Sequence, residues 1–361
     1  MSDPAAPAPP PSPARKPRRT ARRVLLVCLA LLLLAGAALG ILWLQLQAWA
    51  ARPMPGQGAS VEVDIPKGAG PLAVAELLAA RKVIDDPATF VRWLRYVKRA
   101  AGKLKAGELA FRDDMSPEQV LQVLLDGTPV THRITIPEGL RLDEIAALYQ
   151  QAGLADAAEL ERRARDPALA RALGVPHDSL EGYLFPETYQ FRKPVPADEI
   201  LKTMVAGTRK LFSPEWRARA GELGMSELQV VTLASIVEKE TGAAAERPQI
   251  AGVFHNRLKK GWKLQTDPTV IYAEILATGR FDGTIHQSDL DRDHPYNTYR
   301  RAGLPPGPIC SPGAKALEAV LWPDTTKNMY FVSRNDGTHQ FCPTLECHNA
   351  AVQRYQRGGG P

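Results

Sequence analysis

The first fifty residues contain the longest apolar run of the chain. Residues 24–44 read VLLVCLALLLLAGAALGILWL, without a charge or a proline. A helix of this length spans roughly 30 Å, about the thickness of the hydrocarbon core of a bilayer. The apolar run of a cleaved signal peptide is shorter, and a buried helix of a soluble protein would need no adjacent arginine cluster. Residues 24–44 are therefore predicted to form an uncleaved transmembrane helix.

Six basic side chains lie directly before this run, namely Arg15, Lys16, Arg18, Arg19, Arg22 and Arg23. Positive charge beside a membrane span favours the cytoplasmic side. Residues 1–23 are expected to form a disordered basic cytoplasmic tail, because residues 1–17 are also rich in proline and alanine. The chain from about residue 50 onward is then expected outside the cytoplasm.

A repeated pattern follows the apolar run. Residues 63–68 read VDIPKG and residues 134–139 read ITIPEG, and the same offset aligns apolar positions further along. Each copy predicts a short strand, a Pro-x-Gly turn and an amphipathic helix. Two copies are too few for a solenoid. They indicate a small α+β module over residues 60–155.

The residue composition of the chain changes near residue 178. Residues 180–189 read LEGYLFPETY, in which aromatic residues, glycine and proline crowd together as in an ordered loop. A second domain of mixed helices and strands is expected over residues 178–356. The expected fold class is therefore α+β, with one transmembrane helix before two domains.

The most informative segment of that second domain is residues 226–241, SELQVVTLASIVEKET. It opens with a capping box and is apolar through its middle, which predicts a buried central helix. Its last turn carries Glu238 and Glu240. These side chains point about 200° apart on a helix, so they cannot act as a dyad.

Glu240 is the better candidate for a general acid. It shares a helix face with bulky aliphatic residues, namely Leu233, Ile236 and Val237. Burial against them and the negative end of the helix dipole both raise the pKa of a carboxyl group. Acid catalysis near neutral pH needs such a rise. The alternative is that Glu238 and Glu240 end a solvated helix and pair with Lys239 or Arg247.

The composition excludes several classes of function. The net charge is +6, but five of these charges come from residues 1–23, so no nucleic-acid-binding surface is expected on the rest of the chain. The sequence contains no phosphate-binding loop, no dinucleotide fingerprint, and no His-Glu-x-x-His or Gly-x-Ser-x-Gly motif. We therefore expect no metal and no organic cofactor.

Three of the four cysteines lie in the part expected outside the cytoplasm, where disulfides can persist. Cys342 and Cys347 could close a small loop, which would leave Cys310 unpaired. Free thiols are one alternative. A zinc site that adds His339 or His348 is another, although the spacing matches no usual structural zinc pattern.

Three runs together resemble the endolytic murein transglycosylase family, the MltG or YceG-like membrane-anchored enzymes. They are ASIVEKET at 234–241, LQTDPTVIY at 264–272, and YNTY at 296–299 before GLPPGPI at 303–309. The strand–turn–helix repeat is also similar to LysM-like modules that bind cell-wall glycan. A structural stalk or dimerising module is the alternative there, and few exposed aromatics are expected for stacking on sugar, Trp93 and Tyr96 being the nearest.

The resemblance implies a single-pass protein of the inner membrane, with a cytoplasmic N-terminus and a periplasmic catalytic part. Such enzymes cleave the β-1,4 bond between MurNAc and GlcNAc in nascent peptidoglycan. One glutamate, followed by Ser or Thr, protonates the glycosidic oxygen, and the muramic C6 hydroxyl then attacks C1 to leave a 1,6-anhydro end. This pattern selects Glu240, before Thr241. It also implies a terminator of strand elongation that partners peptidoglycan synthases.

Polar groups are expected around the oxocarbenium-like transition state of such a reaction. The candidate substrate contacts are Gln265, Thr266, Asp267, Tyr296, Asn297, Tyr299, Glu181, Tyr183 and Glu187, each with a structural role as its alternative. Two other functions stay open. A lysozyme-type hydrolase would need a second carboxylate, for which Asp267 is the best candidate, and a non-enzymatic wall-binding or divisome scaffold would need none.

Overall fold

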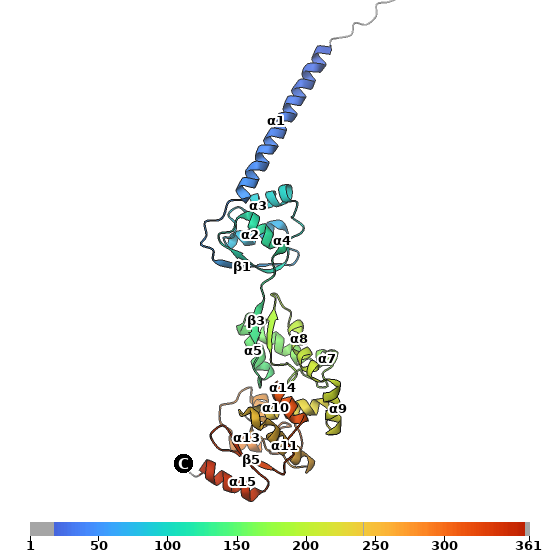
Figure 1. The fold of residues 1–361 in the computed structure, drawn as a ribbon, viewed down its shortest axis with the longest axis vertical. Coiled ribbons are helices and arrows are strands. Elements are labelled where there is room, and N and C mark those ends of the chain that lie inside the picture. The colour runs from blue at the N-terminus through green and yellow to red at the C-terminus, as the bar shows by residue number, and fades with distance from the viewer. Residues whose placement is uncertain (1–17, 241, 358–361) are drawn as a thin grey trace, which may run out of the picture. The chain divides into compact units, whose positions relative to one another are not determined.

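The chain divides after Val130 into two units, each with its own hydrophobic core. The computed structural model describes residues 18–240 and 242–357, and both units mix helices with short antiparallel strands (Figure 1). The α+β class is confirmed. The expected module over 60–155 does not coincide with one unit, because residues 131–155 belong to the second.

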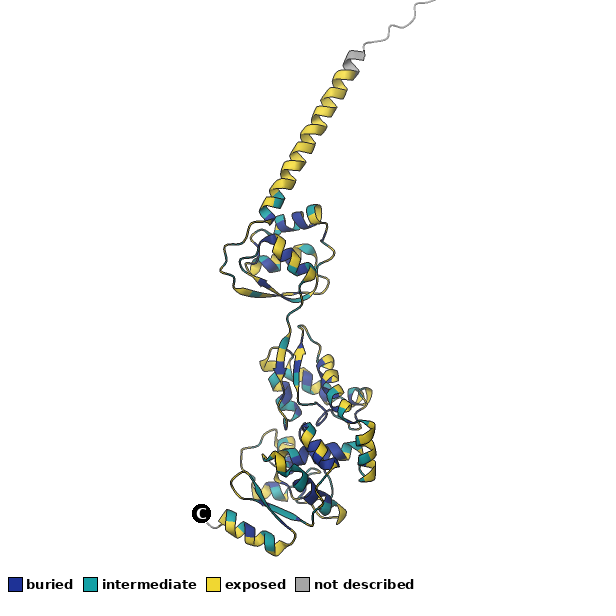
Figure 2. Cartoon of the chain, viewed as in Figure 1, coloured by how far each residue is buried: buried dark blue, intermediate teal, exposed yellow. Residues whose placement is uncertain are grey.

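The first unit begins with one long apolar helix, α1 (Arg18–Ala50). Its segment Arg22–Ala50 is long and apolar enough to cross a membrane, and its most apolar 18-residue window has a mean hydropathy of 2.9 and is exposed (Figure 2). The helix starts before the expected residue 24, so residues 18–23 are helical rather than disordered. The rest of the expected tail, residues 1–17, lies outside the described residues.

The helix also continues past residue 44, because its last two turns pack against protein. Leu46 and Trp49 contact the core of the first unit, and Ala50 is buried in it. The indole Nε1 of Trp93 donates to Oε1 of Gln47 at 3.3 Å. The end of α1 is therefore part of the first unit's core.

The remainder of the first unit is a two-stranded sheet covered by helices. Its elements are β1 (Ser60–Ile65), α2 (Pro71–Ala80), α3 (Pro87–Trp93) with a π-helical turn (Leu94–Lys98), β2 (Gly107–Arg112) and α4 (Pro117–Asp126). β1 and β2 pair antiparallel, from Ser60 opposite Arg112 to Ile65 opposite Gly107. Trp93 is fully buried here, whereas Tyr96 is exposed, so only Tyr96 of the two expected aromatics could stack on a sugar.

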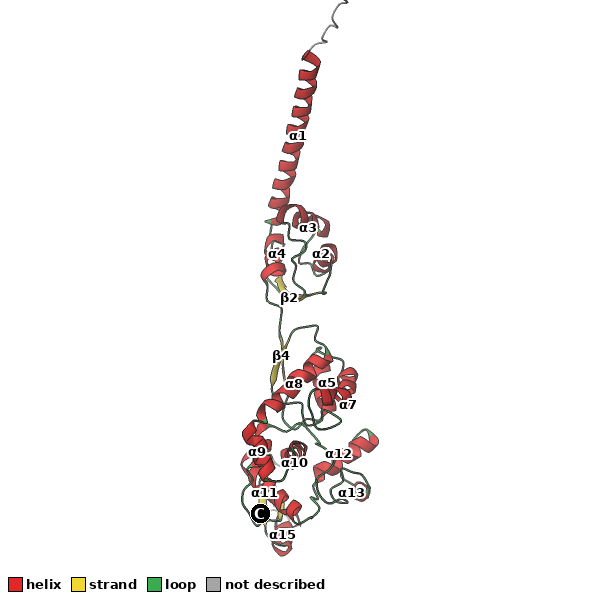
Figure 3. Cartoon of the chain, turned by 90° about the vertical axis from the view of Figure 1, so that its right-hand side faces the viewer, coloured by secondary structure: helices red, strands yellow, loops and turns green. Residues whose placement is uncertain are grey.

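The second unit contains most of the helices of the described chain (Figure 3). In order they are β3 (His132–Thr135), α5 (Leu142–Gln151), α6 (Ala157–Ala164), α7 (Pro167–Ala172), β4 (Thr188–Phe191), α8 (Ala197–Leu211), α9 (Pro214–Glu222), α10 (Glu227–Glu240), a 3₁₀ turn (Ala244–Glu246), α11 (Arg247–Lys259), α12 (Asp267–Thr278), α13 (Gln287–Asp291), α14 (Ala314–Leu321), β5 (Tyr330–Ser333), β6 (His339–Cys342), α15 (Leu345–Val352) and a π-helical turn (Gln353–Arg357). β3 pairs with β4 and β5 with β6, both antiparallel.

The internal repeat is visible in both units. Five aligned pairs of apolar residues are buried in both copies: Val63 and Ile134, Ile65 and Ile136, Val74 and Ile145, Ala75 and Ala146, Leu78 and Tyr149. Gly68 and Gly139 end the two Pro-x-Gly turns with φ of 82° and 78°, a left-handed conformation that glycine adopts without strain. The second copy is built into the core of the second unit, which runs without a break from Ile134 to Leu321. The domain boundary expected near residue 178 is therefore not a boundary of the core.

Helix α10 lies at the centre of that core. Its capping box is formed, since Gln229 N donates to Ser226 Oγ at 3.2 Å and Ser226 N donates to Gln229 Oε1 at 2.8 Å. All eight residues from Val230 to Val237 are buried. The helix is thus buried on every side along this stretch, and α11, α12 and α14 pack around it. Because the helix is packed in this way, its last turn is held in a fixed position.

Candidate active site

The two glutamates of the last turn of α10 have different partners. Glu238 binds Arg247 at 2.7 Å and accepts a hydrogen bond from Gly313 N at 2.9 Å. Glu240 instead accepts a hydrogen bond from the hydroxyl of Thr266. The pairing with Arg247 that was expected as an alternative for both glutamates applies to Glu238. Because the whole middle of the helix is buried, these partners and not the helix faces distinguish the two residues.

The surroundings of Glu240 favour its protonated form. Burial is the largest influence and raises the pKa of this carboxyl to about 7, and the negative charge of Asp267 adds to the rise. The hydrogen bond from Thr266 and the positive charge of Arg257 act in the opposite direction. A carboxylic acid with this pKa is substantially protonated at neutral pH and can act as a general acid.

Thr266 is held by a small network of hydroxyl groups. Its N–H donates to Thr298 Oγ1 at 3.1 Å, and the hydroxyls of Thr298 and Thr269 lie 2.8 Å apart. Thr269 also donates to the carbonyl oxygen of Thr266 at 2.7 Å. All three threonines are buried. This network fixes the Thr266 hydroxyl against Glu240, at the start of α12.

Asp267 and Tyr299 meet beside Glu240. The hydroxyl of Tyr299 donates to Asp267 Oδ1 at 2.6 Å. Tyr299 is positioned from its own loop, because its N–H donates to Asn297 Oδ1 at 2.9 Å. The predicted residues from two distant runs of the chain are therefore brought together.

These residues line a groove of about 480 Å³. Its lining includes Glu240, Arg257, Gln265, Asp267 and Tyr299. It also includes β5, His339 of β6, and the α15 side chains Leu345, His348 and Val352. Glu240 is half-buried rather than fully enclosed, because it opens into this groove.

Glu181 is the second carboxyl with a strongly raised pKa, also about 7 and also because of burial. Only 2% of its surface is exposed, and it does not line the groove of Glu240. Its oxygens accept hydrogen bonds from Leu142 N at 3.1 Å, at the start of α5, and from the hydroxyl of Tyr272 at 3.2 Å. Glu181 therefore caps a helix inside the core.

Four other predicted contacts lie away from the groove. Tyr183 is fully buried in the core, and Glu187 is exposed next to β4. Tyr296 packs against Tyr272 with ring centroids 4.9 Å apart. Asn297 is fully buried and donates from Nδ2 to carbonyl oxygens at the end of α13, the nearest being Arg292 O at 2.8 Å. Asn297 acts on the groove only through Tyr299.

The groove also contains residues that were not predicted as substrate contacts. Arg257 of α11 is buried, donates from Nε to Met329 O at 2.8 Å, and lies 5.5 Å from the ring centroid of Tyr330. His339 is held at 2.7 Å from Oε2 of Glu246. Burial lowers the pKa of Arg257. Their positions depend on the hairpin β5–β6, and a strand pattern alone does not reveal which side chains face Glu240.

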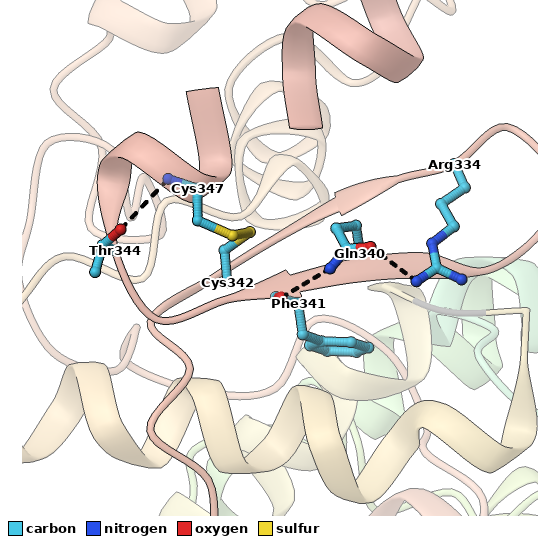
Figure 4. Close-up of a disulfide and its surroundings, with 6 residues drawn as sticks. All are labelled: Arg334, Gln340, Phe341, Cys342, Thr344 and Cys347. Carbon is cyan, nitrogen blue, oxygen red and sulfur yellow. Dashed lines mark hydrogen bonds between the residues drawn. A yellow bond between two sulfur atoms is a disulfide. The ribbon is translucent and has the colours of Figure 1, made fainter. Parts of the chain in front are cut away.

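The cysteines settle one open alternative. Cys342 and Cys347 form a disulfide that joins β6 to α15, and Figure 4 shows it beside the hydrogen bond from Cys347 N to Thr344. Cys310 is a free, buried thiol. A zinc site on Cys342 and Cys347 is thereby excluded. Among the described residues no cluster of three or more His, Cys, Asp or Glu side chains could hold a metal.

Comparison with known proteins identifies relatives over most of the chain. A model of the YceG-like family matches residues 63–354. The chain is 33% identical over 313 residues to the endolytic murein transglycosylase of Bacillus subtilis strain 168, covering 82% of this chain and 85% of that protein. It is 30% identical over 328 residues to the endolytic murein transglycosylase of Streptococcus pneumoniae serotype 2, of whose length it spans 58%.

A solved structure agrees with these relatives. The 2.6 Å crystal structure of a YceG-like protein from Listeria monocytogenes has 33% sequence identity and a TM-score of 0.54, and the match covers 81% of this chain and 99% of that one. The family model, the curated relatives and this structure each match about four fifths of the chain. The chain belongs to the YceG-like family.

Proposed function

We propose that this protein is a membrane-anchored endolytic lytic transglycosylase that cleaves the β-1,4 bond between MurNAc and GlcNAc in peptidoglycan strands. The observation that carries the proposal is Glu240, a carboxyl with a pKa of about 7 at the end of a buried helix, open to a groove. The names of the two curated relatives, endolytic murein transglycosylases, support the same activity.

The reaction needs one carboxyl group in two roles. Protonated Glu240 donates its proton to the glycosidic oxygen, and the bond from that oxygen to C1 of the muramic residue breaks. The resulting carboxylate then takes the proton of the muramic C6 hydroxyl while its oxygen attacks C1. The products are a 1,6-anhydromuramic end and a free hydroxyl on the leaving sugar. No second carboxylate is needed to activate water, because the nucleophile belongs to the substrate.

The surrounding residues suit these steps. Arg257 stabilises the carboxylate that forms when Glu240 gives up its proton, and the Thr266 hydroxyl does the same by donating a hydrogen bond. Gln265, Asp267 and Tyr299 line the groove and are the proposed substrate contacts. Asp267, partnered by Tyr299, contributes negative charge near a developing oxocarbenium ion, which stabilises it.

The apolar helix α1 supports a single-pass anchor in the inner membrane. The basic residues before it favour a cytoplasmic N-terminus and a periplasmic groove. The disulfide Cys342–Cys347 agrees with an oxidising compartment. An enzyme anchored there would meet strands as they emerge, so we propose that it terminates their elongation beside peptidoglycan synthases.

A lysozyme-type hydrolase is the second candidate, because Asp267 shares the groove with Glu240. The masses of the products decide between the two reactions. Full-length protein in detergent is incubated with nascent, uncrosslinked glycan strands, and the new ends are analysed by mass spectrometry. Anhydro ends are expected. Reducing ends, heavier by one water, would identify a hydrolase, and uncut strands would indicate a scaffold.

A further inference from the structure

Exposed large apolar side chains are few on the described part of the second unit. They are Trp262, Leu276, Trp322 and Leu345. Leu345 lines the groove of Glu240, and Trp262 contacts Tyr330, which also lines it. Two of the four thus border the candidate active site. An exposed aromatic side chain beside a groove offers a flat apolar face to a ligand.

Trp262 belongs to a row of aromatic rings that leads out of the groove. His348 stacks on Tyr330 with centroids 5.2 Å apart and an interplanar angle of 25°. Tyr330 in turn meets Trp262 at 6.1 Å. The guanidinium of Arg257 lies over the Tyr330 ring, 5.5 Å from its centroid. Tyr330 is therefore packed among His348, Arg257 and Trp262. Of the three rings, Trp262 is the one that is exposed, at 41%.

The position of Trp262 is fixed by the backbone and not by a loose loop. Its N–H donates to Arg257 O at 2.9 Å, just after α11 ends, and Gly261 before it takes a φ of 67°. The helix that carries Arg257 into the groove therefore also presents the indole next to it. A rigid, exposed indole has a flat apolar face and a polar N–H edge.

We propose that Trp262 forms an outer subsite of the groove, where its ring stacks on a pyranose of the glycan strand beyond the sugars at Glu240. The C–H groups on one face of a β-linked hexosamine form an apolar surface, and covering that surface with an aromatic ring removes both from water. Lys260, with Nζ 5.6 Å from the Trp262 ring centroid, adds a positive charge for the carboxylates of the strand's peptides. The subsite rests on the proposed function, since it lets the same groove bind one more sugar unit of the glycan strand.

The test measures binding separately from turnover. Full-length protein carrying Glu240→Gln is titrated in detergent with uncrosslinked glycan strands, alone and combined with Trp262→Ala or Trp322→Ala. Trp322 is a matched control: it is 38% exposed, but it packs against Trp216 and lines a different pocket, with Arg247 and Pro248. Trp262→Ala is expected to weaken binding about tenfold, an effect of one stacked ring, whereas Trp322→Ala leaves affinity unchanged.

Two further measurements sharpen the result. Trp262→Tyr keeps a ring and should restore most of the affinity, and a MurNAc–GlcNAc disaccharide should bind Trp262→Ala and parent protein alike, because it is too short to reach the outer ring. Equal affinity of Trp262→Ala and Trp322→Ala for long strands overturns the subsite. Failure of the proposed function would look different: protein with Glu240 intact would leave the strands uncut or would release reducing ends, whatever the affinities of the Trp262 variants.

Discussion

Glu238 and Glu240 end the same helix two residues apart, and only their partners separate a structural carboxylate from a candidate acid. The Glu238 side chain is 5% exposed and pairs with Arg247, itself 13% exposed. Glu240 pairs with an uncharged hydroxyl and opens into the groove. Burial beside an uncharged partner raises the pKa of the Glu240 carboxyl, so this group can hold a proton at neutral pH.

Substitution of each glutamate should therefore have a different effect. Glu240→Gln is expected to lower turnover by about 10²- to 10⁴-fold, the usual contribution of a general acid, with the fold intact. Glu238→Gln weakens a nearly buried ion pair and should cost about 1–3 kcal/mol of stability while turnover by the folded protein stays within a few-fold. Thermal unfolding and release of anhydro ends are the measurements. Normal turnover by Glu240→Gln would show that another group supplies the proton.

Activity should fall at alkaline pH. The acid must be protonated, so kcat/KM is expected to be level below about pH 7, the pKa of Glu240, and to drop tenfold per unit above it. Thr266→Val removes a hydrogen bond that favours the carboxylate, which raises the pKa and shifts the alkaline limb to higher pH. Thr266→Ser keeps the hydroxyl and is the control. A limb that does not move in Thr266→Val would mean that a different group titrates.

Much of this site could be anticipated from the sequence. The buried helix, its terminal Glu240, and the convergence of residues 265–267 with Tyr299 follow from apolar periodicity and from the resemblance of short runs. That a residue is polar did not reveal whether its side chain faces the groove or the core. Asn297 binds the end of α13 and Glu181 caps α5, because each satisfies backbone groups that would otherwise be buried without partners.

The extent of the units was harder to predict. The second repeat copy has the same local pattern as the first, but its turn binds the end of α10: Lys239 Nζ donates to Gly139 O at 3.2 Å, and Gly139 N donates to Ser311 O at 2.9 Å. Contacts between segments so far apart decide which unit a copy joins. A periodic pattern contains no information about such contacts, so the boundary at residue 130 was missed.

Glu181 should affect stability and not chemistry. Its pKa is raised from 4.5 to about 7, so the folded state binds more protons than the unfolded state between these values, and stability falls as pH rises through that window. Glu181→Gln removes this loss and is expected to raise the melting temperature at pH 8 but not at pH 4, with turnover within a few-fold of the parent. Glu181→Ala also removes the cap of α5 and should cost about 1 kcal/mol. Complete loss of turnover in folded Glu181→Gln would place this carboxyl in the reaction.

The disulfide should hold one wall of the groove in place. Cys342–Cys347 ties β6 to α15, and α15 contributes Leu345, His348 and Val352 to the groove. In the chain-entropy model, a disulfide that closes so short a loop stabilises the folded protein by roughly 2 kcal/mol. The double substitution Cys342→Ala and Cys347→Ala is expected to speed hydrogen exchange in residues 343–357 and to lower kcat/KM several-fold.

Reduction of the parent protein should reproduce that effect, because it breaks the same bond. The double variant should not respond to reductant, and Cys310→Ala, which removes the buried free thiol, should respond as the parent does. If the double variant keeps full turnover although hydrogen exchange in α15 is faster, the α15 part of the groove does not position the glycan strand. Substrate would then be held by the α10–α12 side of the groove, where Glu240, Thr266 and Asp267 meet.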